Sequence, residues 1–336
     1  MSLRPRGSWP VVLAVLLVLV GCTPDEAAPP PAPAPEPSPT ATGPAGVRAG
    51  IVFPPAAGDG DPQITQLTAA MRTLESRRPD LVSQLRPLTP DGPEFVADLG
   101  LLFVQRGTDL ICLVGTDGTR VAGRLANRHP ELRFCALPTR AGELPDNLQV
   151  VDVRLEELGH VAGATAAAAV DEAPVAMVVG ADRLGLQRFR DGVRAGVGDA
   201  DLLEWFPTSS DEALAAVEAA VAAGAGALVL DVGWQATDLL VLAEDAGLAL
   251  LAPQSALASD RLQVAAALGW SVRWELALDP LVQRLVDDTT EVPASIGLAE
   301  DAFVLSPGPR GPRGALDRAV AELRDGARDA VAPTEE

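Results

Sequence analysis

Three short apolar runs constrain what this chain can fold into more than any other feature of the sequence. They are Leu110–Val114, Leu132–Leu137 and Val175–Val179, and helical patterns separate them. Strands that are buried on both faces of a parallel sheet form continuous apolar runs of this kind. The alternation continues to about residue 328, so the sequence predicts an α/β fold with mostly parallel sheets.

The same pattern places further strands on both sides of these runs. We expect strands at Arg48–Phe53, Leu81–Leu88, Asp201–Phe206, Ala227–Asp231, Leu248–Ala252, Gln263–Leu268 and Ala302–Leu305. A helix is expected to begin after Asp61, because aspartate followed by Pro62 is a typical helix start.

The residues that follow the expected strands are candidates for ligand binding, because ligands of open α/β sheets bind at the carboxyl ends of strands. These candidates are Gly115, Thr116, Gly180, Asp182, Gly233 and Trp234. For Trp234, stacking on a ligand and ordinary packing are equally open alternatives.

Residues 1–22 have the pattern of a targeting segment. Arg4 and Arg6 precede the apolar run Val11–Val20, which is shorter than the roughly 20 residues that span a bilayer. The segment closes with Leu19-Val20-Gly21-Cys22, which resembles a bacterial lipobox. We therefore expect Cys22 to be lipidated and to anchor the chain to a membrane; the alternative is an ordinary secretory signal with a chance cysteine.

Residues 23–46 are rich in proline and alanine and predict an extended tether. The remaining chain of about 290 residues is long enough for two lobes. A net charge of −20 argues against nucleic acid as a partner, because binding to phosphates requires basic patches.

Several pieces of the sequence, in the same order, resemble the basic membrane protein family, the substrate-binding lipoproteins of ABC importers that include purine-nucleoside receptors. The pieces are DLICLVG, ANRHPELRFCALP, LPDNLQVVDVRLEELGHVAGATAA, PVAMVVG with RFRDGVRAGV, and AGAGALVLDVGWQA. The resemblance runs from about residue 48 to residue 328. It implies a type I periplasmic-binding-protein fold, in which two doubly wound parallel-sheet lobes are joined by a hinge and enclose a ligand.

On this resemblance, residues 47–170 and 271–330 would form the N-terminal lobe and residues 171–270 the C-terminal lobe. The hinge would cross near Asp171-Glu172 and near Trp270-Ser271. The implied function is an extracytoplasmic monomer that binds a small polar metabolite, with a nucleoside as the first guess, and passes it to an ABC permease. The alternative is a non-transport sensor or adaptor lipoprotein on the same fold.

The family's ligand motif is only partly present. Its Asp–x–x–Phe–Asn element aligns with Asp61, Ile64 and Thr65, so the aspartate is retained while the aromatic and the asparagine are replaced. Asp61 is either a helix N-cap or a ligand contact, and the two roles are compatible. The family's lysine near Ser271 is absent, and Arg273 is the nearest cation; it either meets an anionic group or is solvated or paired.

No catalytic, metal or cofactor site is expected. The two histidines, His129 and His160, have no cysteine or carboxylate at metal-ligand spacing, and no nucleophile or phosphate-loop motif is present. Cys112 and Cys135 lie on expected neighbouring strands. We expect two buried thiols rather than a disulfide, because bridges between neighbouring strands are geometrically awkward. Trp270 and Trp274 are expected to pack in the core or hinge.

Overall fold

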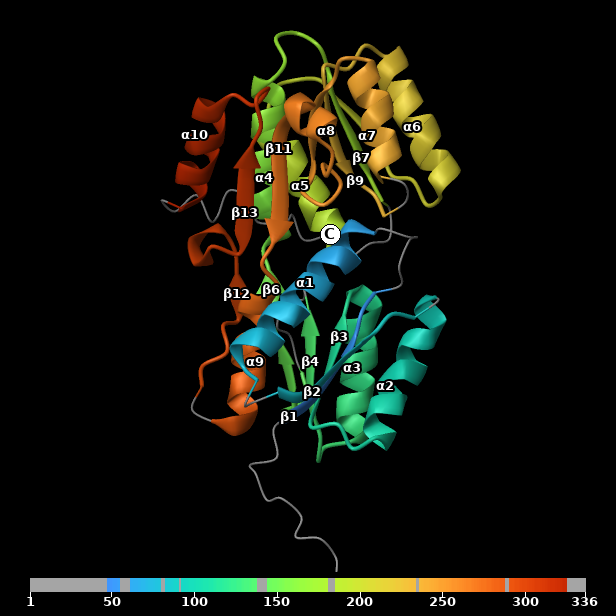
Figure 1. Cartoon of the computed structure of the whole chain (residues 1–336), viewed down its shortest axis with the longest axis vertical. Coiled ribbons are helices and arrows are strands. Elements are labelled where there is room, and N and C mark those ends of the chain that lie inside the picture. The colour runs from blue at the N-terminus through green and yellow to red at the C-terminus, as the bar shows by residue number, and fades with distance from the viewer. Residues whose placement is uncertain are drawn as a thin grey trace, which may run out of the picture. The chain divides into compact units, whose positions relative to one another are not determined.

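The computed structural model describes residues 47–54, 61–79, 82–90, 92–137, 144–180, 185–233, 236–287 and 290–324 (Figure 1). Cys22, the tether, Asp182 and Trp234 lie outside these ranges.

The first sheet has five parallel strands in the order β2-β1-β3-β4-β5. The strands are β1 (Val47–Val52), β2 (Val82–Leu88), β3 (Leu110–Val114), β4 (Arg133–Leu137) and β5 (Leu148–Val150). Helices α2 (Val96–Gln105) and α3 (Thr116–Arg128) pack together beside β1 and β3, while α1 (Pro62–Arg77) and α9 (Glu275–Val286) pack on each other and contact β2 and β1 respectively. A short 3-10 helix, η1 (Pro93–Phe95), precedes α2. We call this assembly the first lobe.

The second sheet has six strands in the order β13-β11-β10-β9-β7-β8. They are β7 (Val175–Val179), β8 (Leu202–Trp205), β9 (Ala227–Asp231), β10 (Ala249–Pro253), β11 (Ala266–Val272) and β13 (Phe303–Pro307). Its helices are α4 (Leu155–Ala168), α5 (Leu186–Val197), α6 (Ser210–Ala222), α7 (Ala236–Asp245), α8 (Asp260–Ala265) and α10 (Arg313–Arg324). Only β13 runs antiparallel to its neighbour, β11. We call this assembly the second lobe.

The chain passes between the two sheets at three crossovers. Two of them pair as short parallel strands, β6 (Asp152–Val153) and β12 (Ser295–Ile296), and a 3-10 helix, η2 (Leu298–Glu300), follows β12. The other crossover joins β11 to α9 through Arg273 and Trp274.

This arrangement corrects the expected lobe boundaries. Helix α4 packs on α5 and on β9, so the first crossover lies before α4 and not near Asp171. The C-terminal segment also differs: β13 hydrogen-bonds to β11 and α10 packs on α4, so among the described elements after residue 272 only α9 and β12 lie outside the second lobe. The sequence could not reveal this because strand pairing depends on register between distant segments.

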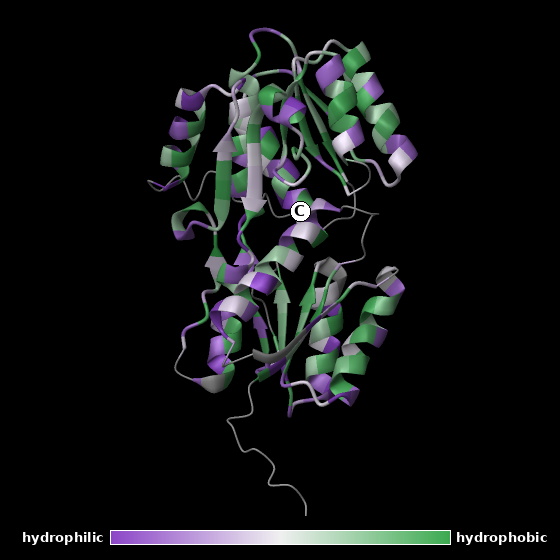
Figure 2. Ribbon diagram, viewed as in Figure 1, coloured by the Kyte–Doolittle hydropathy of each residue, from purple (hydrophilic) through white to green (hydrophobic). Residues whose placement is uncertain are grey.

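Apolar residues fill both faces of each sheet. All residues of β3, β7, β9 and β10 are buried, and all of them except Asp231 at the end of β9 are apolar, as expected of strands inside a parallel sheet. Figure 2 shows hydrophobic residues along these strands and an alternation of hydrophilic and hydrophobic residues along the helices. Trp270 and Trp274 are both buried, which confirms the expected packing, and Trp270 lies with its ring centroid 5.5 Å from that of Phe189.

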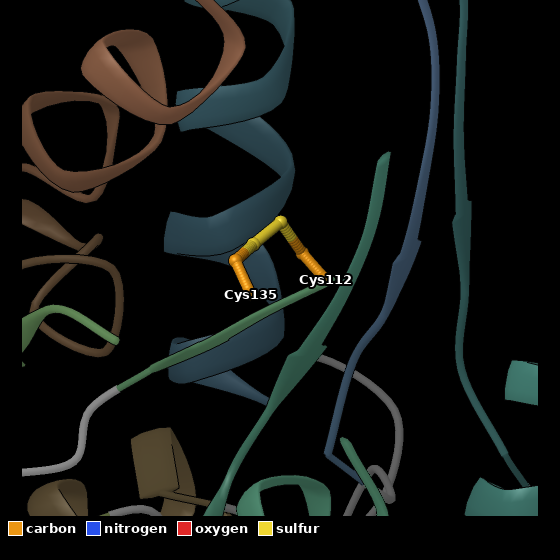
Figure 3. Close-up of a disulfide and its surroundings, with 2 residues drawn as sticks. All are labelled: Cys112 and Cys135. Atoms are coloured by element: carbon orange, nitrogen blue, oxygen red, sulfur yellow. A yellow bond between two sulfur atoms is a disulfide. The ribbon is translucent and has the colours of Figure 1, made fainter. Parts of the chain in front are cut away.

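Cys112 and Cys135 form a disulfide, which corrects the expectation of two thiols (Figure 3). The two residues are direct register partners on β3 and β4, and their Cα atoms are 4.4 Å apart. That separation falls at the short end of the range that a disulfide spans. Both side chains are fully buried, so the bridge lies inside the first lobe.

Within the described ranges, no helix has the length and apolar composition needed to cross a membrane.

Candidate functional site

The strand order creates one topological switch point in each sheet. In the first sheet β1 lies between β2 and β3, and in the second sheet β7 lies between β8 and β9. The connections after β1 and β3 therefore leave toward opposite faces of their sheet, as do those after β7 and β9. A crevice opens at the carboxyl edge of such a pair, and ligands of open α/β sheets bind there.

Two of the expected residues occupy the connection after β1. Asp61 is 2% exposed and caps α1, accepting a hydrogen bond of 2.9 Å from the backbone N–H of Gln63. The hydroxyl of Thr65 donates to the carbonyl oxygen of Asp61 at 2.9 Å. The capping role of Asp61 is thus confirmed, and both side chains organise the first turn of α1.

The expected pair after β3 begins α3. Gly115 has a φ of 113°, a backbone conformation that favours glycine, and its N–H donates to the carbonyl oxygen of Leu137 at 2.7 Å. Thr116 is the first residue of α3. The turn therefore fixes where α3 starts, directly at the carboxyl end of β3.

The expected residues of the second sheet lie at its switch point. Gly180 follows β7 and donates its N–H to the carbonyl oxygen of Asp231, the last residue of β9, at 3.0 Å. Gly233 follows β9 and is buried. The structure thus brings Gly180 and Gly233 to the ends of paired strands; their neighbours Asp182 and Trp234 lie outside the described residues.

Arg273 lies apart from both switch points, on the crossover between β11 and α9. The guanidinium of Arg273 pairs with the carboxylate of Glu275 at 3.1 Å. The backbone N–H of Arg273 donates to the carbonyl oxygen of Ala302 at 2.8 Å. The side chain is about one-third exposed. Of the alternatives that the sequence left open for Arg273, the structure shows the side chain paired with a carboxylate.

Two residues near the second switch point were not singled out from the sequence. Asp231 is a carboxylate, 6% exposed, at the carboxyl end of β9. Phe206 follows β8, is 36% exposed, and has the guanidinium of Arg190 over its ring at 4.4 Å. The signal for both was available, since each is the last residue of an expected strand.

A buried charge cluster joins the first crossover to the second lobe. Arg188, in the first turn of α5, pairs with Asp152 of β6 and with Glu156 of α4. Both carboxylates are less than a tenth exposed. Burial alone would lower the pKa of Arg188, but the hydrogen bonds and charges of Asp152 and Glu156 outweigh it and raise that pKa.

A second cluster joins the two paired crossovers. Arg154 donates to Glu157 of α4, to the hydroxyl of Ser295 and to Glu300. Glu157 also accepts the N–H of Leu298 at 2.7 Å, and Glu300 accepts the N–H of Gly297 at 2.8 Å. Burial would raise the pKa of Glu300, but Arg154 and the backbone donors lower it overall.

The two histidines are not part of the Arg188 or Arg154 charge clusters. His129 contacts Glu131 at 3.4 Å, and His160 lies within α4. Among the described residues, no group of three histidine, cysteine or acidic side chains is placed to hold a metal ion.

One cavity lies away from both switch points. It has a volume of about 440 Å³ and is lined by residues of α8, β11 and β13 and by the segments that precede α8 and follow β13. Its lining includes Gln254, Leu257, Val264, Gly269 and Ser306. Because this cavity is not at a switch point, we do not assign it to the ligand site.

Comparisons with known proteins establish the fold. No family model matches the chain, and no curated protein shows a significant match to its sequence. Among solved structures, an ABC transporter solute-binding protein from Conexibacter woesei DSM 14684 is 17% identical with a TM-score of 0.62, covering 86% of this chain and 98% of that one. The expected type I periplasmic-binding-protein fold with two lobes is confirmed.

Two further solved structures with this fold are described as a solute-binding protein and as a transcriptional activator. An ABC transporter periplasmic solute-binding protein from Actinobacillus succinogenes 130z, with bound D-allose, is 12% identical with a TM-score of 0.59, covering 77% of this chain and 96% of its own. A transcriptional activator of the comK gene from Bacillus halodurans is 12% identical with a TM-score of 0.64, covering 83% and 98%.

Proposed function

We propose that this chain is a lipid-anchored, extracytoplasmic solute-binding protein of an ABC importer, which captures a small polar ligand between its lobes and delivers it to a membrane permease. The observation that carries the proposal is the position of the candidate residues. Connections at both switch points supply Asp61, Thr65, Gly115 and Thr116 from the first sheet, and Gly180 and Gly233 from the second; Asp182 and Trp234, which lie outside the described residues, are proposed with them from their place in the sequence. Such edges are where open α/β sheets bind ligands. The mechanism is capture by hinge closure of one monomer, without covalent chemistry.

The ligand we propose is a hydroxylated ring, with a nucleoside as the first guess. Asp231 supplies a carboxylate that can accept hydrogen bonds from ring hydroxyls, and Phe206, which is 36% exposed, supplies an aromatic side chain beside the same strand ends. The bound D-allose of the Actinobacillus protein is a hydroxylated ring without a base. Sugars therefore belong in the same screen as nucleosides. Arg273 is proposed to act at the crossover and not on the ligand, because it pairs with Glu275.

A stability screen of residues 45–336 tests this proposal. A ligand at 100 times its Kd should raise the free energy of unfolding by about 2.7 kcal/mol, which a thermal melt detects. Asp231→Asn should weaken the response to any hit. Asp201→Asn is the matched control, because Asp201 is exposed and precedes β8 at the opposite, amino end of the sheet. An equal loss of response in both variants would contradict the assigned site.

The lipid anchor has its own test. We expect the full chain to fractionate with membranes and Cys22→Ser to release it, because the acyl chains on Cys22 would supply the attachment. Retention of Cys22→Ser on membranes would contradict the anchor while leaving the ligand proposal intact.

One observation supports the alternative of a sensor or adaptor. The transcriptional activator from Bacillus halodurans has a fold of this type, so the fold is not restricted to proteins named as transport components. The partial family motif, with Ile64 and Thr65 in place of the aromatic and the asparagine, agrees with an altered ligand site. A folded protein that responds to no nucleoside, nucleobase or sugar would favour this alternative.

A further inference from the structure

Arg188 connects helix α5 of the second lobe to the crossover strand β6. The proposed lobe closure requires these two parts to move together. Arg188 lies in the first turn of α5, eight residues along the chain from Gly180 at the carboxyl end of β7. Its guanidinium reaches Asp152 on β6, where a second contact measures 3.2 Å, and Glu156 on α4. The helix beside the second switch point is therefore bonded directly to a crossover strand.

The crossover strands are in turn held to each other. The N–H of Asp152 donates to the carbonyl oxygen of Ala294, and that of Arg154 donates to Ile296, both at 2.9 Å. Arg154 adds contacts to Ser295 and Glu300. We call residues 152–157 and 295–300 the hinge block.

We propose that Arg188 is a positioning residue that fixes the hinge block to the second lobe, so that lobe opening bends the chain on the first-lobe side of the block, near Val150–Val151 and Pro293–Ala294. This inference rests on the proposed two-lobed capture and adds to it the place of bending. A displacement of α5 at the ligand edge then moves β6 with it, which couples the second switch point to the hinge.

Buried charge supports a positioning role over simple stabilisation. An ion pair that is taken out of water recovers its desolvation cost only with well-placed hydrogen bonds, and apolar replacements are often no less stable. Such a cluster fixes a geometry, because a guanidinium binds carboxylates in directions set by its planar shape. Arg188 uses two of its nitrogens on two carboxylates that belong to different elements, β6 and α4.

The test measures lobe separation and amide exchange without any ligand. Spin labels at Arg124→Cys on α3 and Glu218→Cys on α6, both exposed positions, report the distance distribution between the lobes, with the native disulfide kept oxidised. In Arg188→Met, we expect a broader or shifted distribution. Hydrogen exchange at the amides of Asp152 and Arg154 should become at least about tenfold faster, because charge-assisted hydrogen bonds that hold β6 are lost.

Arg194→Met is the matched control. Arg194 lies on the same helix and also binds two carboxylates, Asp191 and Glu204, each at 2.6 Å, but all three residues are on the surface and none belongs to a crossover. We expect it to leave both the distance distribution and the exchange of β6 unchanged. A purely stabilising role of Arg188 would lower the free energy of unfolding in Arg188→Met and speed exchange throughout the core, without a selective effect on β6 and without changing the distance distribution.

A second variant covers the case in which Arg188→Met does not fold. The triple variant Arg188→Met, Asp152→Asn, Glu156→Gln removes the buried charges together, so no carboxylate is left uncompensated. Wild-type distances and exchange in the folded variants would overturn the proposal, as would an equal change in Arg194→Met. Because neither readout requires a ligand, failure here is distinguishable from failure of the ligand screen.

Discussion

Replacing Gly192 by alanine should destabilise the second lobe, although alanine is the better helix former. Gly192 lies in the middle of α5, where the helix crosses α4. A Cβ atom there would stand 2.1 Å from the carbonyl oxygen of Glu156 and 2.8 Å from its carbonyl carbon. Both distances are roughly 1 Å or more inside an ordinary van der Waals contact. The obstacle is backbone, so no side-chain rotation relieves it.

The two opposing effects can be compared. Alanine in a helix interior gains up to about 1 kcal/mol over glycine. Overpacking of a close-packed interior costs about 1–3 kcal/mol, and the upper end applies here because the clash is with a helix backbone. We therefore expect Gly192→Ala to lower the free energy of unfolding by about 2 kcal/mol.

Gly123→Ala in α3 is the control. The nearest atom to a Cβ at Gly123 is Cδ2 of Leu148, at 4.0 Å, so nothing has to move. Here only the helical propensity changes, and the free energy of unfolding should rise by roughly 0.5–1 kcal/mol. Urea denaturation of residues 45–336 measures both variants. If Gly192→Ala were as stable as the wild type, the inferred backbone contact between α4 and α5 would be wrong.

Three further outcomes are expected. Unfolded, unreduced protein comprising residues 45–336 should show no titratable thiol, because Cys112 and Cys135 are bridged; two thiols would contradict the disulfide. Asp61→Ala should cost about 1 kcal/mol in a urea melt through loss of the N-cap, and Asp61→Asn should restore most of it. Burial lowers the pKa of His160, partly offset by Glu322, so the folded state favours neutral imidazole. Stability should therefore fall as the pH drops below about 6.5, and His160→Gln should remove that part of the pH dependence.

The strands were predictable from the sequence where a single segment shows a recognisable apolar run. The runs Leu110–Val114, Val175–Val179 and Ala227–Asp231 are strands with the expected bounds, because burial on both faces favours a continuous apolar run, which in the third strand is broken only at its last residue, Asp231. The short strands β5, β6 and β12 and the helix α8 were not expected. Elements of two to six residues have too few positions to show a period, and their pairing stabilises them.

Features that depend on register between distant segments were missed or wrongly predicted. The disulfide requires Cys112 to lie opposite Cys135 on the neighbouring strand, and a shift of one residue would have turned one side chain to the other face. The placement of β13 depends in the same way on pairing with β11. Neither alignment leaves a local pattern in the sequence.

The candidate site was predicted at the level of strand ends and not of side chains. Gly115, Gly180 and Gly233 follow strands that the sequence identifies, namely β3, β7 and β9. The order of these strands in the sheets brings the three glycines to the switch points. The Arg188 cluster could not be found in this way. Its partner Asp152 is 36 residues away and lies on a two-residue strand, so their contact arises from tertiary packing alone.

The glycines within the family-like motifs explain why the resemblance indicates the fold more strongly than the ligand. Gly163 belongs to the motif on α4, and Gly192 and Gly196 belong to the motif on α5. A Cβ atom at any of them would meet backbone of the other helix within 2.3 Å. These positions therefore allow α4 and α5 to approach closely, which also brings Arg188 within reach of Glu156. This role does not depend on which ligand is bound, because the contact between the helices does not involve the ligand. The family's ligand motif, in contrast, is only partly present, because Asp61 is retained while Ile64 and Thr65 replace the aromatic and the asparagine.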